Sequence, residues 1–342
     1  MHIPDGLLDV KTAVAMGVLS ATGLGVALRH VRLHLPAKRV PLLGLSAAFV
    51  FAAQMLNFPV LPGVSGHLIG GMLTAALLGP SAAVVVISAV LIVQCFLLAD
   101  GGVLALGANI FNMALVGSAG GWVVYYLVSR AVKGLFGRVL AATFASWVAV
   151  VVAAVACAGA LATSGTASWS VLLPMMTGVH MLIGVGEGVI TAMVLTFIAK
   201  TRPEMWGDAA AAKRSQKPEA RSQEMGGGQT VNPTGTERWG AVIVLGLLIC
   251  VGLALFVGPF ACGWDDGLEV TVQQKGVHVS EAAEHLIKVP MPDYKMPGLG
   301  DGRVATGVAG AVGTVVVFGL AWVLARSLVR KMKPAVDVGG SE

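Results

Sequence analysis

Residues 81–98 read SAAVVVISAVLIVQCFLL, a run without a single charged side chain. A helix needs about 17–25 mostly apolar residues to cross the hydrocarbon core of a bilayer, and this run is of that length. The rest of the chain has the same character, because 56% of its 342 residues are hydrophobic and only 12% are charged. Soluble domains carry roughly 25% charged residues. The sequence therefore predicts an integral, all-α polytopic membrane protein.

Similar apolar runs predict about seven spans in the first two hundred residues and two more after them. They lie near 10–28, 40–57, 66–79, 81–98, 103–128, 139–162, 171–199, 239–260 and 304–325. The run at 66–79 is short, which favours a tilted or re-entrant helix packed inside the protein. The first run is not typical of a signal peptide, because Asp5 and Asp9 precede it and the basic residues follow it.

Basic residues occur in a few short segments between the apolar runs. Apart from Lys11 at the start of the first run, those of the first two hundred residues or just beyond follow the first, fifth and seventh runs: Arg29, Arg32, Lys38, Arg39, Arg130, Lys133, Arg138, Lys200 and Arg202. The alternate loops at 58–65, 99–102 and 164–170 contain no Lys or Arg. Because basic loops stay in the cytoplasm, this pattern predicts a multi-pass protein of a prokaryotic cell membrane with its N-terminus outside and its C-terminus inside. It is not typical of a nucleic-acid-binding surface.

The composition divides the chain into two modules. Residues 201–237 mix both charge signs with Gly, Pro, Ser and Gln and lack an apolar face, which is typical of a flexible linker. We expect a metal-binding transmembrane domain at 1–200, a cytoplasmic linker at 201–237 and a two-helix module at 238–333. The loop of this module, 261–302, is acidic on balance, so we place it outside, on the same side as Met1.

The first eight residues, MHIPDGLL, can form a metal chelate. The α-amine of Met1, the backbone nitrogen of His2 and its Nδ1 would close two fused rings around one ion. We expect Met1 to be retained, because removal of an initiator methionine requires a small second residue. Three nitrogens in a plane suit Ni(II) or Cu(II), whereas Zn(II) prefers a tetrahedron.

A fourth nitrogen is available from PVLPGVSGHLIGG at residues 59–71. His67 lies there at the start of the short third run, after a turn rich in Pro and Gly, where it can face the N-terminal segment. The alternative is a histidine at a helix end that is hydrogen-bonded to the backbone.

Four uncommon strings carry a family resemblance: MHIPDGLL at 1–8, SGHLIGG at 65–71, QCFLLADGGVLALGANIFNMA at 94–114 and HMLIGVGEGVIT at 180–191. Together they resemble the CbiM/NikM family, the substrate-binding S components of energy-coupling factor (ECF) transporters for cobalt and nickel. The segment PMPDYKMPGLGDGRVATGVAGAVGT at 290–314 resembles the small CbiN/NikN component. The chain is thus similar to fused NikMN-type proteins, with about seven helices in an S-component bundle plus a two-helix hairpin.

The resemblance implies a function and a ligand set. The chain would import Ni²⁺ or Co²⁺ as its substrate, with no prosthetic group, and would hold the ion through Met1, His2 and His67. It would not be an enzyme, and its energy would come from a coupling protein of the CbiQ/NikQ type and ATPases of the CbiO/NikO type. The choice between nickel and cobalt stays open, although the planar chelate favours nickel.

Polar residues inside the apolar runs are further candidates, because such residues are costly in a membrane and are often functional. Those predicted near the outer ends of the spans could orient His67, hold the N-terminal segment or line the pocket: Asn57, Ser65, Gln94, Asp100, Asn109 and Asn112. His180 and Glu187 are seven apart and share one face of a helix. They could form an inner metal or proton site, but a buried polar tie between helices is the favoured interpretation.

Two other function classes stay open at this stage. An intramembrane metal-dependent enzyme would need an ionisable pair such as His180 and Glu187, and a passive metal channel would lack a tight site. The chain carries no phosphate-binding GxxxxGK[ST] loop and no HExxH motif. We therefore expect ATP hydrolysis to occur on separate subunits.

Overall fold

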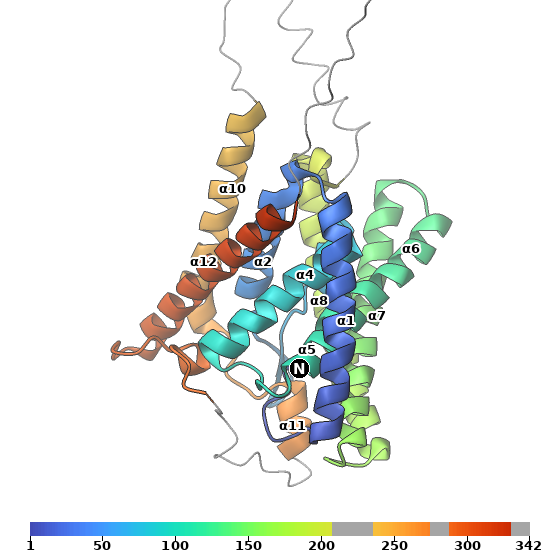
Figure 1. Cartoon of the computed structure of the whole chain (residues 1–342), viewed down its shortest axis with the longest axis vertical. Helices are drawn as coiled ribbons and strands as arrows, with labels where there is room; N and C mark the ends of the chain where they lie inside the picture. Colours follow the sequence, from blue (N-terminus) through green and yellow to red (C-terminus); the bar gives the residue numbers. More distant parts are fainter. Residues whose placement is uncertain (207–234, 274–286, 330–342) are drawn as a thin grey trace, which may run out of the picture.

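The computed structural model describes residues 1–206, 235–273 and 287–329, and these are mostly helical (Figure 1). Most of the predicted linker, residues 207–234, lies outside the described residues. In chain order the first part contains α1 (Val10–His34), α2 (Val40–Gln54), β1 (Phe58–Leu61), β2 (Val64–Gly66), α3 (Gly71–Leu78), α4 (Pro80–Val93), η2 (Gln94–Leu98), α5 (Leu106–Asn109), η3 (Ile110–Gly120), α6 (Gly121–Ala131), α7 (Gly134–Thr163) and α8 (Trp169–Thr201). The second part contains α10 (Gly235–Gly252), η5 (Leu253–Val257), η6 (Gly258–Phe260), α11 (Gly267–Gln273), η8 (Pro292–Tyr294) and α12 (Gly302–Leu328).

Local sequence signals set the ends of α1. The Asp9 carboxylate accepts hydrogen bonds from the backbone N–H groups of Lys11 and Thr12, at 3.1 and 3.2 Å, which satisfies two of the donors that a helix start leaves open. The helix ends at His34, and Leu35 is extended because it precedes Pro36. The first predicted span is therefore confirmed as a helix, six residues longer at its C-terminal end than the apolar run.

Seven of the described helical segments are long and apolar enough to cross a membrane. The all-α polytopic prediction is thus confirmed, but two predicted spans differ in detail. The run at 40–57 forms α2, of 15 residues, and then leaves the helix toward β1. The run at 66–79 forms only the eight-residue α3, whose side chains are nearly all buried, as expected for a helix packed inside the protein. Gly70, at φ +76°, lets the chain turn sharply into α3.

The two modules pack closely through glycines. Figure 1 shows α10 and α12 beside α2 and α4, on the flank away from α6 and α7. A Cβ at Gly313 of α12 would lie 2.2 Å from the Phe51 ring, and one at Gly310 would lie 2.3 Å from Met55. A larger residue at Gly313 would force the buried Phe51 ring or α12 to shift, and one at Gly310 would displace the flexible end of Met55. The second module is therefore fixed against the first instead of being merely tethered to it.

The pair Gly184 and Gly188 has the same role inside the first module. Added Cβ atoms there would lie 2.9 Å from Trp147 and 3.1 Å from the backbone oxygen of Thr143, both on α7. This GxxxG pair therefore brings α8 against α7, as ordinary packing within the bundle predicts.

Candidate metal centre

The N-terminal segment does not project into solvent but inserts into the molecule, where the N-terminus lies between α1, α5 and α11 (Figure 1). Ile3 is fully buried, and Asn109 holds both its backbone groups: the Ile3 N–H donates to Asn109 Oδ1 at 2.8 Å, and Asn109 Nδ2 donates to the Ile3 oxygen at 3.1 Å. The N–H of Gly102 also donates to this oxygen, at 2.9 Å. Asp5 accepts N–H bonds of 3.0 and 2.8 Å from residues 103–104. These bonds fix the segment directly behind His2.

The loop that carries His67 is held from beneath by α8 and α2. Both carboxylate oxygens of Glu187 accept backbone N–H bonds, from Ile69 at 2.7 Å and from Gly70 at 3.0 Å. The Ile69 oxygen accepts a bond of 2.9 Å from Gln54 Nε2. Glu187 is 1% exposed, so this bidentate contact satisfies backbone donors that no water could reach. Glu187 thus links α8 to the loop before α3, and not to another helix as the predicted tie between helices would.

The His67 ring presents its Nε2 lone pair to the N-terminus. Nδ1–H donates to the oxygen of Leu68 at 3.0 Å, which leaves Nε2 as the unprotonated nitrogen. The Met1 amine lies 3.2 Å from this Nε2. Burial lowers the pKa of His67 to about 3, and the charges of the terminal ammonium and His2 act in the same direction. At neutral pH the ring is therefore neutral, as a metal ligand must be.

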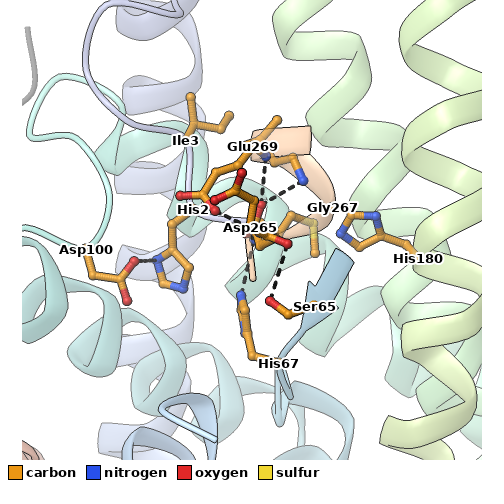
Figure 2. A network of polar contacts seen from close by, with 12 residues as sticks. His2, Ile3, Ser65, His67, Asp100, His180, Asp265, Gly267 and Glu269 are labelled. Carbon is orange, nitrogen blue, oxygen red and sulfur yellow. Dashed lines mark hydrogen bonds and ion pairs between the residues drawn. The ribbon is translucent and has the colours of Figure 1, made fainter. Parts of the chain in front are cut away.

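His2 lies beside His67, with their ring centroids 5.2 Å apart (Figure 2). Among the described residues, His2 Nδ1 has no hydrogen-bond partner, although the side chain is only 8% exposed. The nearest acidic group is Asp100, whose Oδ1 lies 3.5 Å away. Burial lowers the pKa of His2 as well, against the opposing charge of Asp100. A buried nitrogen without a partner is rare, and a missing ligand is one explanation for it.

The distance between the Met1 amine and His67 Nε2 can be compared with that between neighbouring donors of a metal site. A metal–nitrogen bond of about 2.0 Å places neighbouring donors of a square about 2.8 Å apart. The observed 3.2 Å between the Met1 amine and His67 Nε2 is within half an ångström of that value. No cluster of three or more His, Cys, Asp or Glu side chains that could hold a metal occurs in the described part of the chain. The terminal amine and the backbone nitrogen would therefore be necessary as donors.

The second module reaches this centre through a segment that the sequence did not single out. The Asp266 carboxylate forms an ion pair with the Met1 ammonium. Asp266 also forms a parallel bridge with Ser65, whose N–H donates to the oxygen of Asp265 at 2.8 Å and whose Oγ donates to the oxygen of Trp264 at 2.7 Å (Figure 2). Only the general acidity of the 261–302 loop hinted at such a carboxylate.

The ion pair controls the protonation of both its members. Burial by itself would lower the pKa of the terminal amine, but the charge and hydrogen bond of Asp266 raise that pKa above 8.0. Burial acts in the opposite sense on Asp266, but the terminal ammonium and His67 hold its pKa well below the usual range. Without a metal, the amine is therefore a protonated ammonium.

Two cavities adjoin the centre. A small one, with a volume of about 10 Å³, lies between Met1, His67, His180 and Asp266 and is about the size of one water molecule. A larger one, of about 530 Å³, lies between the modules and is lined by His2 and His67 together with Asn57, Asp100 and Asp293. This larger cavity places polar side chains of both modules beside the two histidines.

The remaining candidate residues fall into different surroundings. Gln94 Nε2 donates to Gln54 Oε1 at 2.8 Å, and thus joins the network under the His67 loop. His180 donates from Nδ1 to the oxygen of Met176 at 2.7 Å, within its own helix, while its ring lines the small cavity. Asn112 does not contact the N-terminal segment by a hydrogen bond in the described structure, and its amide is buried without a partner in η3.

Comparison with known proteins relates this chain to metal transport proteins. Residues 2–205 match the family CbiM, described as a cobalt uptake substrate-specific transmembrane region, and residues 240–330 match a PDGLE domain. A protein of Archaeoglobus fulgidus, to which the name fused nickel transport protein NikMN is provisionally given, is 36% identical over 95% of this chain and 98% of its own length.

A second relative and a solved structure extend the comparison. The fused nickel transport protein NikMN of Rhodobacter capsulatus is 34% identical over 60% of this chain and 63% of its own length. A crystal structure named as a truncated transition metal transporter superposes with a TM-score of 0.53 and 34% identity, covering 58% of this chain and 99% of that one. This chain therefore belongs to the CbiM family of cobalt uptake substrate-specific transmembrane proteins, and it is a multi-pass nickel or cobalt transport component, not an enzyme.

Proposed function

We propose that the chain is the ion-capturing S component of an ATP-driven energy-coupling factor transporter for Ni²⁺ or Co²⁺. The ligands would be the Met1 amine, the backbone nitrogen and Nδ1 of His2, and Nε2 of His67. The observation that supports this most strongly is that the Met1 amine and His67 Nε2, which lie 66 residues apart in the sequence, meet at one buried place. The amine lies 3.2 Å from His67 Nε2, and His2 Nδ1 is buried without a hydrogen-bond partner in the described structure.

The ion would replace protons at this centre. The His67 lone pair now accepts a hydrogen bond from the terminal ammonium, and a metal ion would take the place of that proton between the two nitrogens. Binding would also release the proton of the His2 backbone amide. Metal capture would thus release two protons, and the Met1 amine would have to leave Asp266.

We place the centre on the outer side of the membrane. The N-terminal segment, residues 99–102 and the 261–273 segment meet at one end of the molecule, and none of them contains a Lys or Arg. The basic segments after α1 and α8 lie at the ends of long helices. A coupling protein of the CbiQ/NikQ type and ATPases of the CbiO/NikO type would dock from the cytoplasmic side and supply the energy for opening the site inward.

The first test is calorimetric Ni²⁺ titration of the purified full chain against a variant with two alanines inserted between Met1 and His2. One alanine would not suffice, because the amine, two backbone nitrogens and Nδ1 of a histidine at position 3 could still close a planar chelate. The insertion leaves every residue from His2 onward in place but moves the terminal amine out of the chelate. We expect the affinity to fall by more than about 100-fold, because a lost ligand should exceed the 10–100-fold effect of a lost outer partner.

The control is His34→Ala, which removes an exposed histidine from the end of α1 and should bind Ni²⁺ like the unmodified chain. Equal affinity in the insertion variant would refute the amine as a ligand. Weak binding by the unmodified chain itself would favour a passive channel, since a pore must let the ion leave.

A further inference from the structure

The hydroxyl of Tyr294, in the second module, lies where two series of hydrogen bonds meet. It donates to Asp100 Oδ2 at 2.6 Å and accepts from Gln94 Nε2 at 3.2 Å. Both partners belong to the first module. A single hydroxyl of the second module thus joins the side chains of Asp100 and Gln94, whose backbones are already linked by a bond of 3.1 Å from the Asp100 N–H to the Gln94 oxygen.

The first series of hydrogen bonds leads toward His2. Asp100 has one oxygen bound to Tyr294, and its other oxygen, Oδ1, lies 3.5 Å from His2 Nδ1. A carboxylate rotates about its last bond unless a partner fixes it, and the Tyr294 hydroxyl supplies that partner. The carboxylate charge is thereby directed at the donor atom of His2, beside the place where the cation would bind.

The second series of hydrogen bonds leads to the His67 loop. Gln94 Nε2 donates to Gln54 Oε1 at 2.8 Å, and Gln54 Nε2 donates to the oxygen of Ile69 at 2.9 Å. Ile69 is two residues from His67, and its N–H is bound by Glu187. The same hydroxyl is therefore connected to the supports of both histidines.

The backbone around Tyr294 is held in an unfavourable conformation. Asp293 and Tyr294 have φ values of +51° and +57°, in the left-handed region that residues with side chains rarely adopt. The segment is held there by a bond of 3.0 Å from the N–H of Met291 to the oxygen of Leu97 and by the approach of the Tyr294 ring to Phe51. Such strain persists only where surrounding contacts impose it, and it is concentrated at functional sites.

We propose that Tyr294 is a positioning residue of the metal centre, through which the second module orients Asp100 toward His2 and supports the His67 loop. The proposal rests on the proposed function, because it assigns Tyr294 a role only if His2 and His67 bind the ion. It accounts for the two left-handed residues, for the 2.6 Å bond across the module boundary and for the orientation of Asp100.

The test is Tyr294→Phe in the full chain, which removes one hydroxyl and keeps the ring. Outer partners of metal ligands contribute 10–100-fold to affinity, so we expect Ni²⁺ to bind about 10-fold more weakly with unchanged stoichiometry. The visible absorption of bound Ni²⁺ should also shift, because it depends on the ligand geometry. A purely structural role would lower the thermal stability without changing this spectrum.

The matched control is Tyr126→Phe, which removes an exposed hydroxyl that interacts with Arg130. It should bind Ni²⁺ like the unmodified chain. A comparable loss in both variants would overturn the proposal.

A double-mutant cycle with Asp100→Asn tests the route of action. If Tyr294 acts through Asp100, Tyr294→Phe should change the affinity less when Asp100 is already replaced. Additive losses would overturn the route through Asp100. The two proposals can fail separately: if the alanine insertion abolishes binding but Tyr294→Phe changes neither affinity nor spectrum, only the role of Tyr294 is refuted. If the insertion has no effect, the proposed function is refuted, and this proposal with it.

Discussion

The N-terminal segment, residues 1–5, and the His67 loop, residues 64–70, supply the candidate ligands in different ways. The loop is held by Glu187 and Gln54 from its own module, and the His67 ring has a fixed tautomer. The backbone of the segment is fixed behind its donors, at Ile3 and Asp5. Its Met1 amine pairs with a carboxylate of the other module, and its His2 Nδ1 has no hydrogen-bond partner in the described structure.

In the proposed metal centre, this difference would mean that the His67 side is built in advance and that the ion completes the N-terminal side. The loop would provide one rigid nitrogen, and the segment would then close around the metal with three. A preorganised ligand lowers the cost of ordering on binding. Replacing residues on each side should therefore give different signatures in affinity, stability and pH dependence.

The largest effect is expected from His67→Ala, which removes the rigid nitrogen. Affinity for Ni²⁺ should fall by more than about 100-fold in calorimetry, above the range for a lost outer partner. The fold should persist, because the loop is fixed by Glu187 through the backbone of Ile69 and Gly70 and not by the ring. Unchanged affinity, with His34→Ala as the control, would show that the loop is not part of the centre.

Glu187→Ala should break the support of the loop without touching a ligand. Two buried N–H groups would lose their acceptor at about 1–3 kcal/mol each, so we expect a destabilisation of about 3 kcal/mol. The measurement is the thermal unfolding midpoint in detergent.

Glu187→Gln is the matched control for this change. It retains one acceptor oxygen and should recover part of the lost stability. An unchanged midpoint in Glu187→Ala would argue against the tie between α8 and the loop.

The pH dependence of Ni²⁺ binding should distinguish the His67 nitrogen from the nitrogens of the N-terminal segment. Burial holds the pKa of His67 near 3, so this ring is neutral from pH 8 to pH 6 and adds no pH dependence there. The pKa of the Met1 amine is raised above 8.0, so the amine is protonated in that range and must lose a proton to bind metal.

Each displaced proton lowers the apparent affinity about 10-fold per pH unit as the pH falls. Ni²⁺ affinity should therefore fall by at least about 100-fold between pH 8 and pH 6, and the loss of the amide proton would steepen this change. Calorimetry at several pH values measures the slope. A flat profile would contradict the chelate through the amine and the amide.

Asn109→Ala should give the smallest effect on Ni²⁺ affinity, because it only loosens the N-terminal segment. The substitution removes both hydrogen bonds to Ile3 but leaves that of Gly102, so the segment stays inserted but is held less firmly. We expect Ni²⁺ to bind about 10-fold more weakly, as for other outer partners. Asn57→Ala is the control, because Asn57 lines the larger cavity without holding the segment. Equal losses in both variants would argue against a specific anchor at Ile3.

Much of the fold could be predicted because a bilayer allows few alternatives. The apolar runs marked the long helices, and the short run at 66–79 indicated a helix inside the protein, as α3 is. The early end of α2 and the hairpin of β1 and β2 were missed. A run of apolar residues has the same composition whether it continues as a helix or turns into a short strand, so only its packing distinguishes the two.

The candidate site was predictable where the chemistry is local. Met1 and His2 are adjacent, and a chelate between neighbours needs no tertiary structure. The partners Asp266 and Tyr294 were missed, because each lies more than 190 residues from the group it contacts. No periodicity in a single sequence indicates such a contact.

The sequence by itself determined that this chain is a helical membrane protein and which residues can bind a metal, because hydropathy and donor chemistry are properties of the residues. Only the tertiary structure decided which of these residues meet. It placed the terminal amine between His67 and Asp266, fixed the His67 loop on Glu187, and brought Tyr294 against Asp100. The physical reason is that these contacts depend on how α8 and α12 pack against the rest of the bundle, and such close packing depends on the shapes of residues distant in the chain.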